Sequence, residues 1–141
     1  MKKIVLVLLM VLLSVMLVVS CKEPEANIEW DDLTGTRVWW QQEFDNGRYF
    51  RIQFKDDKTT VILNEGTNGT YSANVTMSAT LKDNVLTLTS TDPEGGATSA
   101  TYTYKLSFDG DKLVLTQTSE DSMCSKYSDQ KTFTMEKKNL G

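Results

Sequence analysis

Cysteine is the residue type in this sequence best suited to covalent chemistry, and the chain has two, Cys21 and Cys124. The thiolate is the reactive form of cysteine, so a reactive thiol needs a base or a positive group beside it. Cys124 has only Lys126 close to it in the sequence. We therefore interpret Cys124 as an inert thiol, and we look to the position of Cys21 in the chain for its role.

The sequence contains no histidine. This removes the usual hydrolytic triads, histidine-based acid–base catalysis and most catalytic zinc sites. Two carboxylates flank a glycine in Asp109-Gly110-Asp111, but a calcium loop needs further oxygen ligands at fixed offsets, and Lys112 and Leu113 follow instead. We interpret this motif as a hairpin turn. The sequence thus predicts no catalytic residue, no metal site and no enzyme.

The first 20 residues have the composition of an export signal. Lys2 and Lys3 precede an apolar run over residues 4–19 that is interrupted only by Ser14. The run is slightly longer than the roughly 7 to 15 residues of a typical signal and shorter than the roughly 20 needed to span a bilayer. We predict that residues 1–20 are a cleaved signal peptide, with an uncleaved anchor as the alternative.

The end of this segment, Val18-Val19-Ser20-Cys21, resembles the lipobox of bacterial lipoproteins. The resemblance implies cleavage before Cys21, a diacylglyceryl thioether on its sulfur, and further acylation of the new amino group. Two or three acyl chains hold a protein stably at a membrane. Lys22 stands where inner-membrane retention in Gram-negative systems uses Asp, which favours the outer membrane. Covalent lipid is the only cofactor expected, and it leaves Cys124 without a disulfide partner.

The mature chain has room for one domain. Of the 15 basic residues, Lys2 and Lys3 lie in the signal, which leaves 13 basic against 19 acidic residues and argues against nucleic acid as a partner. Residues 21–32 are rich in acidic side chains and are predicted to be a lipidated tether with little to bury. We assign residues 33–138 to the folded domain and residues 139–141 to a tail.

From Gly35 onward the apolar residues alternate with polar ones, and turn signals recur about every ten residues, as in a sandwich or barrel. Asn46-Gly47 favours a first hairpin. Further turns are predicted at residues 56–57, 64–69, 82–84, 92–96 and 109–111, which gives about eight strands. The fold class is all-β: an antiparallel up-and-down meander that closes, or nearly closes, into a barrel. A flattened two-sheet sandwich is the alternative, and any helix should be a short turn.

Alternation also predicts which side chains face inward. In residues 71–81 the odd-numbered positions carry apolar side chains, and in residues 100–108 the even-numbered positions do. We expect these side chains to form the core, and we expect Trp39 to point outward. An eight-stranded barrel either fills with side chains or holds one small ligand. Core packing is the favoured interpretation of the inward aromatic residues. If a cavity exists, the residues we expect to bind ligand are Trp40, Phe54, Tyr71, Tyr102 and Tyr104.

Five short motifs between residues 33 and 116 are similar to those of the lipocalin-like lipoproteins of bacteria. They are Leu33-Thr34-Gly35-Thr36, Phe54-Lys55-Asp56-Asp57-Lys58-Thr59, Gly69-Thr70-Tyr71-Ser72, Asn84-Val85-Leu86-Thr87-Leu88-Thr89 and Gly110-Asp111-Lys112-Leu113-Val114-Leu115-Thr116. The resemblance implies a barrel whose mouth or interior accepts a small apolar molecule. The chain departs from the family at Arg37, where the Gly-x-Trp motif has Trp.

Three hypotheses follow for function. The leading one is a lipid-anchored envelope protein whose barrel binds a small apolar ligand. The second is a protein-interaction or inhibitor module with a packed barrel, in which an exposed Trp39 marks the contact surface and the partner is unknown. The third, an envelope enzyme, finds no candidate carboxylate.

Overall fold

A computed structural model describes residues 25–67, 74–90, 100–121 and 130–140. These ranges contain eight strands, one turn of α-helix and one 3-10 turn. The helices are α2 (Trp30–Leu33) and η1 (Asp45–Gly47). The strands are β1 (Val38–Glu43), β2 (Arg48–Phe54), β3 (Thr60–Thr67), β4 (Val75–Lys82), β5 (Val85–Ser90), β6 (Ala100–Asp109), β7 (Lys112–Gln117) and β8 (Thr132–Asn139).

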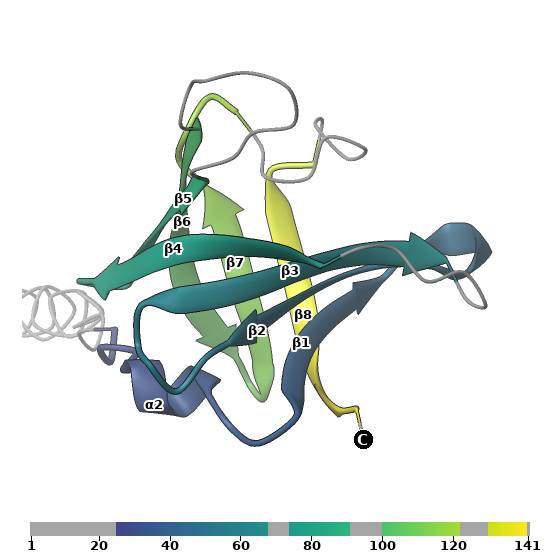
Figure 1. Cartoon of the computed structure of the whole chain (residues 1–141), viewed down its shortest axis with the longest axis horizontal. Helices are drawn as coiled ribbons and strands as arrows, with labels where there is room; N and C mark the ends of the chain where they lie inside the picture. The colour runs from purple at the N-terminus through teal and green to yellow at the C-terminus, as the bar shows by residue number, and fades with distance from the viewer. Residues whose placement is uncertain (1–24, 68–73, 91–99, 122–129, 141) are drawn as a thin grey trace, which may run out of the picture.

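The eight strands form a closed barrel in which each strand pairs antiparallel with the next along the chain (Figure 1). The last strand closes the barrel on the first, with Val38 opposite Asn139 and Gln41 opposite Glu136. Closure removes the two strand edges that an open meander would expose. The all-β, up-and-down barrel predicted from the sequence is therefore confirmed, and it is closed rather than a two-sheet sandwich.

Tight turns at one end of the barrel use residues that tolerate a positive φ. Asp83 and Asn84 join β4 to β5 with φ of 50° and 59°, and Gly110 joins β6 to β7 with φ of 62°. Asparagine, aspartate and glycine enter this left-handed region at the lowest cost. One predicted turn is wrong in extent: Asn64 lies inside β3, which runs to Thr67 before the chain turns.

The inward side chains pack into a single apolar cluster. Its members come from all eight strands and from residues 28–33, and the largest fully buried ones are Tyr104, Phe50, Phe54, Phe133, Leu33, Ile52, Leu86, Leu88, Leu106, Leu113, Leu115 and Met135. Each buried leucine or isoleucine contributes roughly 1.5–3 kcal/mol relative to an exposed one. This core holds the strands in register.

Two residues predicted to face the core are exposed instead. The exposed fraction is 50% for Val75 and 42% for Phe108. Both lie at the end of a strand, Val75 at the start of β4 and Phe108 one residue before the end of β6. Alternation gives the side to which a side chain points but not how far the core extends along the strand. Tyr71 and Ala73 lie outside the described residues.

The prediction that the segment before Leu33 has little to bury is wrong for Ile28 and Trp30. Their exposed fractions are only 8% and 6%, and both belong to the core cluster. We call residues 25–33 the N-terminal strap. The barrel also extends one residue beyond its predicted end, because β8 continues to Asn139.

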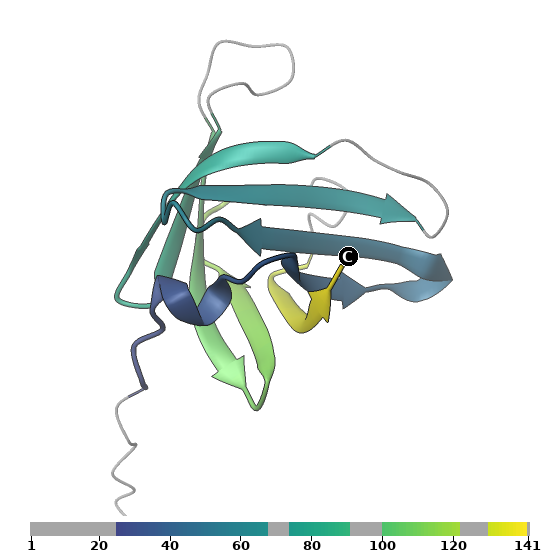
Figure 2. The ribbon, with the colours of Figure 1, turned by 60° about the horizontal axis from the view of Figure 1, so that its bottom comes forward.

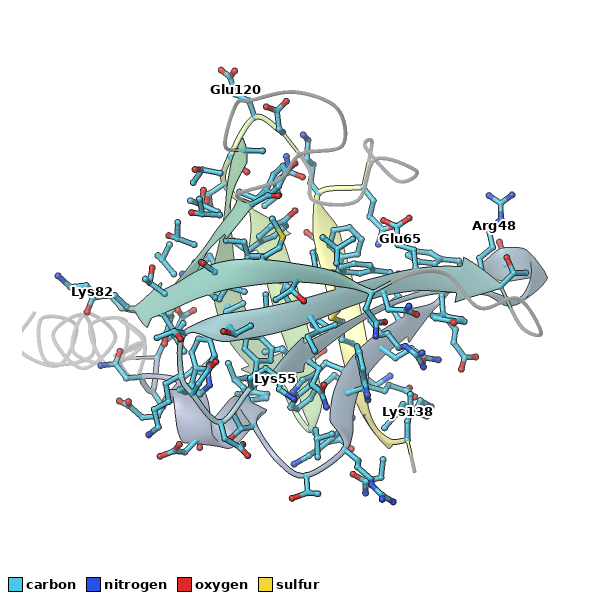
Figure 3. The ribbon with its side chains drawn as sticks, viewed as in Figure 1. Arg48, Lys55, Glu65, Lys82, Glu120 and Lys138 are labelled. Atoms are coloured by element: carbon cyan, nitrogen blue, oxygen red, sulfur yellow. The ribbon has the colours of Figure 1, made fainter. Side chains whose placement is uncertain are left out.

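The strap crosses one end of the barrel, which we call the strap end. Figure 2 shows α2 at this end together with the β6–β7 hairpin. The opposite end, the far end, carries η1 and the start of β2. Lys82 and Arg48, labelled in Figure 3, lie at the strap end and the far end respectively. Within the described ranges, no helix has the length and apolar character needed to cross a bilayer.

Candidate binding groove

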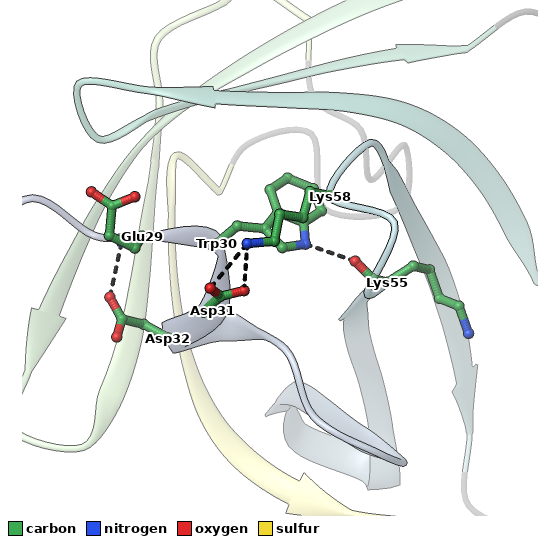
Figure 4. Close-up of polar contacts among 6 residues, drawn as sticks. All are labelled: Glu29, Trp30, Asp31, Asp32, Lys55 and Lys58. Atoms are coloured by element: carbon green, nitrogen blue, oxygen red, sulfur yellow. Dashed lines mark hydrogen bonds and ion pairs between the residues drawn. The ribbon is translucent and has the colours of Figure 1, made fainter.

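The strap is held against the barrel by apolar burial and by one indole hydrogen bond. The Trp30 ring meets Phe54 edge-on, with ring centroids 5.4 Å apart and an interplanar angle of 84°. Its Nε1 donates a hydrogen bond of 2.7 Å to the backbone oxygen of Lys55, in the loop after β2 (Figure 4). Buried indole groups usually have such a partner. Trp30 therefore holds the strap against the barrel core.

Charged side chains on the outside of α2 form contacts that contribute little to stability. Lys58 forms an ion pair of 2.9 Å with Asp31, and the backbone N–H of Glu29 donates to Asp32 at 2.8 Å (Figure 4). Both ion-pair side chains are largely exposed. Exposed pairs contribute about 0–1 kcal/mol, so the buried contacts of the strap matter more.

Asn84 fastens the first part of the strap. Its Oδ1 accepts a 2.7 Å hydrogen bond from the backbone N–H of Ile28, and its Nδ2 donates to the backbone oxygen of Ala26 at 3.2 Å. The residue is buried, with 7% of its surface exposed. An ion pair of 3.0 Å between Lys105 and Glu25 holds the segment further toward its start. One side chain thus satisfies two backbone groups of a segment that is nearly 60 residues away in the sequence.

Trp40 is fixed beside the strap by its own hydrogen bond. Its Nε1 donates to the backbone oxygen of Leu33 at 3.0 Å, and only 2% of its surface is exposed. The Phe108 ring lies against it, with ring centroids 5.9 Å apart and an interplanar angle of 53°. The two aromatic rings form one apolar wall at the strap end, of which Phe108 is the exposed part.

Phe108 is exposed because the β6–β7 hairpin extends past β5. Pairing of β5 with β6 stops at Val85 opposite Lys105, whereas β6 continues to Asp109 opposite Lys112 of β7. The last residues of β6 therefore have a partner strand on one side only. Phe108 keeps the inward direction of Leu106, but it lies beyond the packed core.

The strap, the hairpin and the Trp40–Phe108 wall enclose a groove of about 660 Å³. Its lining residues come from five parts of the chain: Glu25, Ala26, Asn27, Ile28 and Asp32 of the strap, Trp40 of β1, Asn84 before β5, the hairpin residues Ser107, Phe108, Gly110 and Asp111, and Lys137 of β8. Binding sites for small molecules have volumes of roughly 300–1,000 Å³ and combine apolar walls with a few polar groups. The groove has a volume in this range, and its lining combines apolar and polar residues in the same way.

The polar groups of the groove carry both signs of charge. Lys137 of β8 places its Nζ 5.8 Å from the centroid of the Trp40 ring. Glu25, Asp32 and Asp111 supply carboxylates, of which that of Glu25 is paired with Lys105. A ligand seated here would have its body against the exposed ring of Phe108 and its polar atoms at the charged rim.

Of the five predicted ligand-binding residues, the structure places Trp40 alone in the groove. Phe54 and Tyr104 are fully buried in the core, and Tyr102 is partly buried against it. Tyr71 lies outside the described residues, as do Cys21 and Cys124. The sequence analysis missed Ile28 and Asn84. The apolar spacing of Ile28, Trp30 and Leu33 within an acidic segment was the signal available for the strap.

A second aromatic cluster lies on the outer face of β1–β3, and we call it the arginine stack. The guanidinium carbon of Arg51 lies 4.8 Å from the centroid of the Trp39 ring and 4.9 Å from that of Tyr49. Arg51 Nε donates a 3.1 Å hydrogen bond to Oδ1 of Asn64, which is almost completely buried. A Cβ atom at Gly66 would overlap the Tyr49 ring, so the glycine makes room for it. Trp39 faces outward as predicted, and its ring is covered by Arg51.

A smaller hollow of about 330 Å³ adjoins the arginine stack, lined by Trp39, Arg37, Gln53, Asp56 and neighbouring residues. Arg37 has a φ of 63°, so the chain turns sharply before β1. The walls are mainly polar. This hollow offers less apolar contact than the groove does.

Two carboxyl groups have altered proton affinity, and both lie outside the groove. Hydrogen bonds from Thr60 and Thr59 lower the pKa of Asp57 in the β2–β3 turn. Hydrogen bonds from Lys138 and Lys112 lower the pKa of Glu136 on β8. Both groups are exposed, so their role is local. No group of three metal-binding side chains occurs in the part of the chain that the structure describes.

Comparison of the chain with protein-family models, with curated proteins and with solved structures finds no match. The assignment of the fold as a closed eight-stranded antiparallel barrel therefore rests on the strand pairing in this structure.

Proposed function

We propose that this chain is an exported, lipid-anchored protein of the cell envelope whose barrel binds a small apolar molecule. The lipobox-like Val18-Val19-Ser20-Cys21 supports the anchor on Cys21, and Lys22 supports delivery to the outer membrane. The eight-stranded meander supports the lipocalin-like interpretation of the domain. The lipid on Cys21 is the only cofactor proposed, and no catalytic step is assigned.

The observation that carries the ligand proposal is the groove with Phe108 on its wall. An aromatic side chain with 42% of its surface exposed stands against a buried tryptophan, in a hollow of about 660 Å³. Apolar surface left in water costs roughly 25 cal/mol per Å², which a bound apolar molecule would recover. The proposed binding residues are therefore Trp40, Phe108 and Ile28, with Lys137 at the rim. The proposed site therefore lies at the strap end of the barrel and not in the barrel interior.

The test is native mass spectrometry of residues 22–141, followed by denaturing extraction of any bound molecule. Three proteins are compared: the unchanged chain, Phe108→Asp in the groove, and Val75→Asp as the matched control at another exposed apolar residue. We expect the same small apolar passenger on the unchanged chain and on Val75→Asp, and none on Phe108→Asp. A passenger retained by Phe108→Asp, or a clean apo mass for all three proteins, would contradict the proposal.

The arginine stack favours a second candidate, a protein-interaction module. Arginine, tyrosine and tryptophan are the residues most often found at the energetic centre of protein interfaces. Here Arg51 stacks against both Tyr49 and Trp39 on the outer face. Cross-linking in the native envelope through a photoreactive residue at Gln53 tests this candidate. A single cross-linked protein that disappears in Arg51→Ala would support it, and the absence of any cross-link would contradict it.

A further inference from the structure

The position of the groove relative to the start of the folded chain has a consequence for how the barrel sits on a membrane. Glu25 and Ala26 line the groove and are the first two residues of the described chain. Ala26 is held by the hydrogen bond from Asn84 to its backbone oxygen, and Glu25 forms an exposed ion pair with Lys105. The described part of the chain therefore begins at the groove itself.

Chain length then limits how far the groove can stand from the lipid. Four residue steps separate Cys21 from Glu25, and a fully extended chain spans at most about 14 Å over that length. The acyl chains on Cys21 place that residue at the headgroup layer. The far end is separated from the groove by the length of the barrel, because the eight residues of β3 rise by roughly 24 Å. The tether thus keeps the strap end close to the bilayer, whereas it sets no such limit on the far end.

The strap end carries an exposed aromatic ring and two lysines that can contact lipid, beside the carboxylates of Glu25, Asp32 and Asp111 that line the groove. Phe108 lies one residue from the end of β6 and is exposed beside the groove, so it can meet the apolar boundary of the bilayer. Lys112 and Lys137 are on the same hairpin and on the neighbouring end of β8, where they can meet lipid phosphates. Lys112 is also paired with Glu136.

We infer that the strap end faces the bilayer and that the groove takes its ligand, an amphipathic lipid with an acyl or similar apolar body, directly from the membrane surface. This inference rests on the proposed lipid anchor and on the proposed ligand site. It specifies the source and class of the ligand, and it predicts that lipid anchoring and ligand uptake occur on the same side of the protein.

The test uses the full lipidated chain in nanodiscs of phosphatidylethanolamine and phosphatidylglycerol that contain a nickel-chelating lipid. A nitroxide is attached at Asp111→Cys in the groove or at Asp45→Cys at the far end, both in a Cys124→Ser background. Both sites are exposed turn residues, so substitution should leave the fold intact. Asp109→Cys serves as a second label at the strap end.

We expect nickel-dependent relaxation to be several-fold stronger for the labels at Asp111 and Asp109 than for the label at Asp45. Equal relaxation at the two ends, or stronger relaxation at Asp45, would overturn the inference, as would a mass without lipid on Cys21. Passenger binding by soluble residues 22–141 is measured separately. A failure of membrane orientation can therefore be distinguished from a failure of the groove to bind ligand.

Discussion

Trp39 and Trp40 are neighbours in the sequence, yet they belong to two different aromatic clusters. Trp40 faces inward, bonds the strap through its Nε1, and leaves its partner Phe108 exposed at the groove. Trp39 faces outward, and Arg51 lies between its ring and that of Tyr49. In both clusters a cation of the protein lies over the tryptophan ring. In the groove, part of the aromatic surface has no protein partner.

This difference separates an aromatic cluster that stabilises the fold from one that is available to a ligand. Exposure alone does not separate them, because Trp39 is itself partly exposed. What matters is whether a neighbouring side chain covers the ring and whether the backbone beside it leaves a hollow. The groove exists because β6 and β7 extend beyond β5 while the strap bridges the gap.

The largest expected effect compares two phenylalanines. Phe133 is fully buried, with its ring centroid 5.3 Å from that of Phe50, so Phe133→Ala should lower the free energy of unfolding by about 3–5 kcal/mol. Phe108→Ala should lower it by about 1 kcal/mol or less, because 42% of the Phe108 surface is already exposed to water. Urea denaturation measures both. Equal losses would mean that Phe108 is part of the core and that the groove is an incidental hollow.

The next effect concerns the strap. Asn84→Gly keeps a residue that tolerates the φ of 59° but removes the bonds to Ala26 and Ile28, so we expect a loss of roughly 1–3 kcal/mol. Asp83→Gly, at the neighbouring turn position with a φ of 50° and an exposed side chain, is the matched control. Hydrogen exchange at the Ile28 amide should accelerate in Asn84→Gly alone. Unchanged exchange there would show that Asn84 does not hold the strap.

A smaller effect is expected in the arginine stack. Arg51→Lys keeps the charge but loses the planar group between the two rings and the hydrogen bond to Asn64, so stability should fall by about 1 kcal/mol. Arg48→Lys, at an exposed position on the same strand, should be neutral. Passenger binding should be the same in both variants and in the unchanged chain. Loss of passenger in Arg51→Lys would place the ligand on the outer face.

The smallest effect is the acid titration of Asp57. Its pKa is lowered chiefly by a hydrogen bond from the Thr60 side chain and next by the Thr59 N–H. A folded-state pKa below that of the unfolded chain adds stability that is fully present above the unfolded pKa and is lost as the pH falls through the folded one. Thr60→Val should therefore raise the pKa of Asp57 toward its ordinary value. Carbon-detected NMR titration measures it, and an unchanged pKa would show that the Thr60 hydroxyl is not the cause.

The barrel was predictable because its signals are local. Alternation in residues such as Leu86 and Leu88 gives the buried face, and Asn84 and Gly110 mark turns by their tolerance of positive φ. An even-numbered meander of neighbouring pairs then leaves closure of β1 on β8 as the way to remove both edges. These steps use only periodicity and turn chemistry.

The groove was not predictable in the same way, because it depends on relative strand length and on a contact of long range. Nothing near Phe108 in the sequence shows that β5 stops pairing at Val85. Asn84 predicted a turn, but its bonds to Ala26 and Ile28 involve a segment that looked like a polar tether. Tyr104 could be assigned to the inner face, but whether the core filled the space around it required the packing of all eight strands.

The most direct test of the binding proposal is an isotope-filtered NOE experiment on the labelled protein with its unlabelled co-purified passenger. The account predicts intermolecular NOEs from the passenger to ring protons of Trp40 and Phe108 and to the Ile28 side chain. NOEs to Phe50 and Phe133 in the barrel core, or to Trp39 and Tyr49 on the outer face, would contradict it.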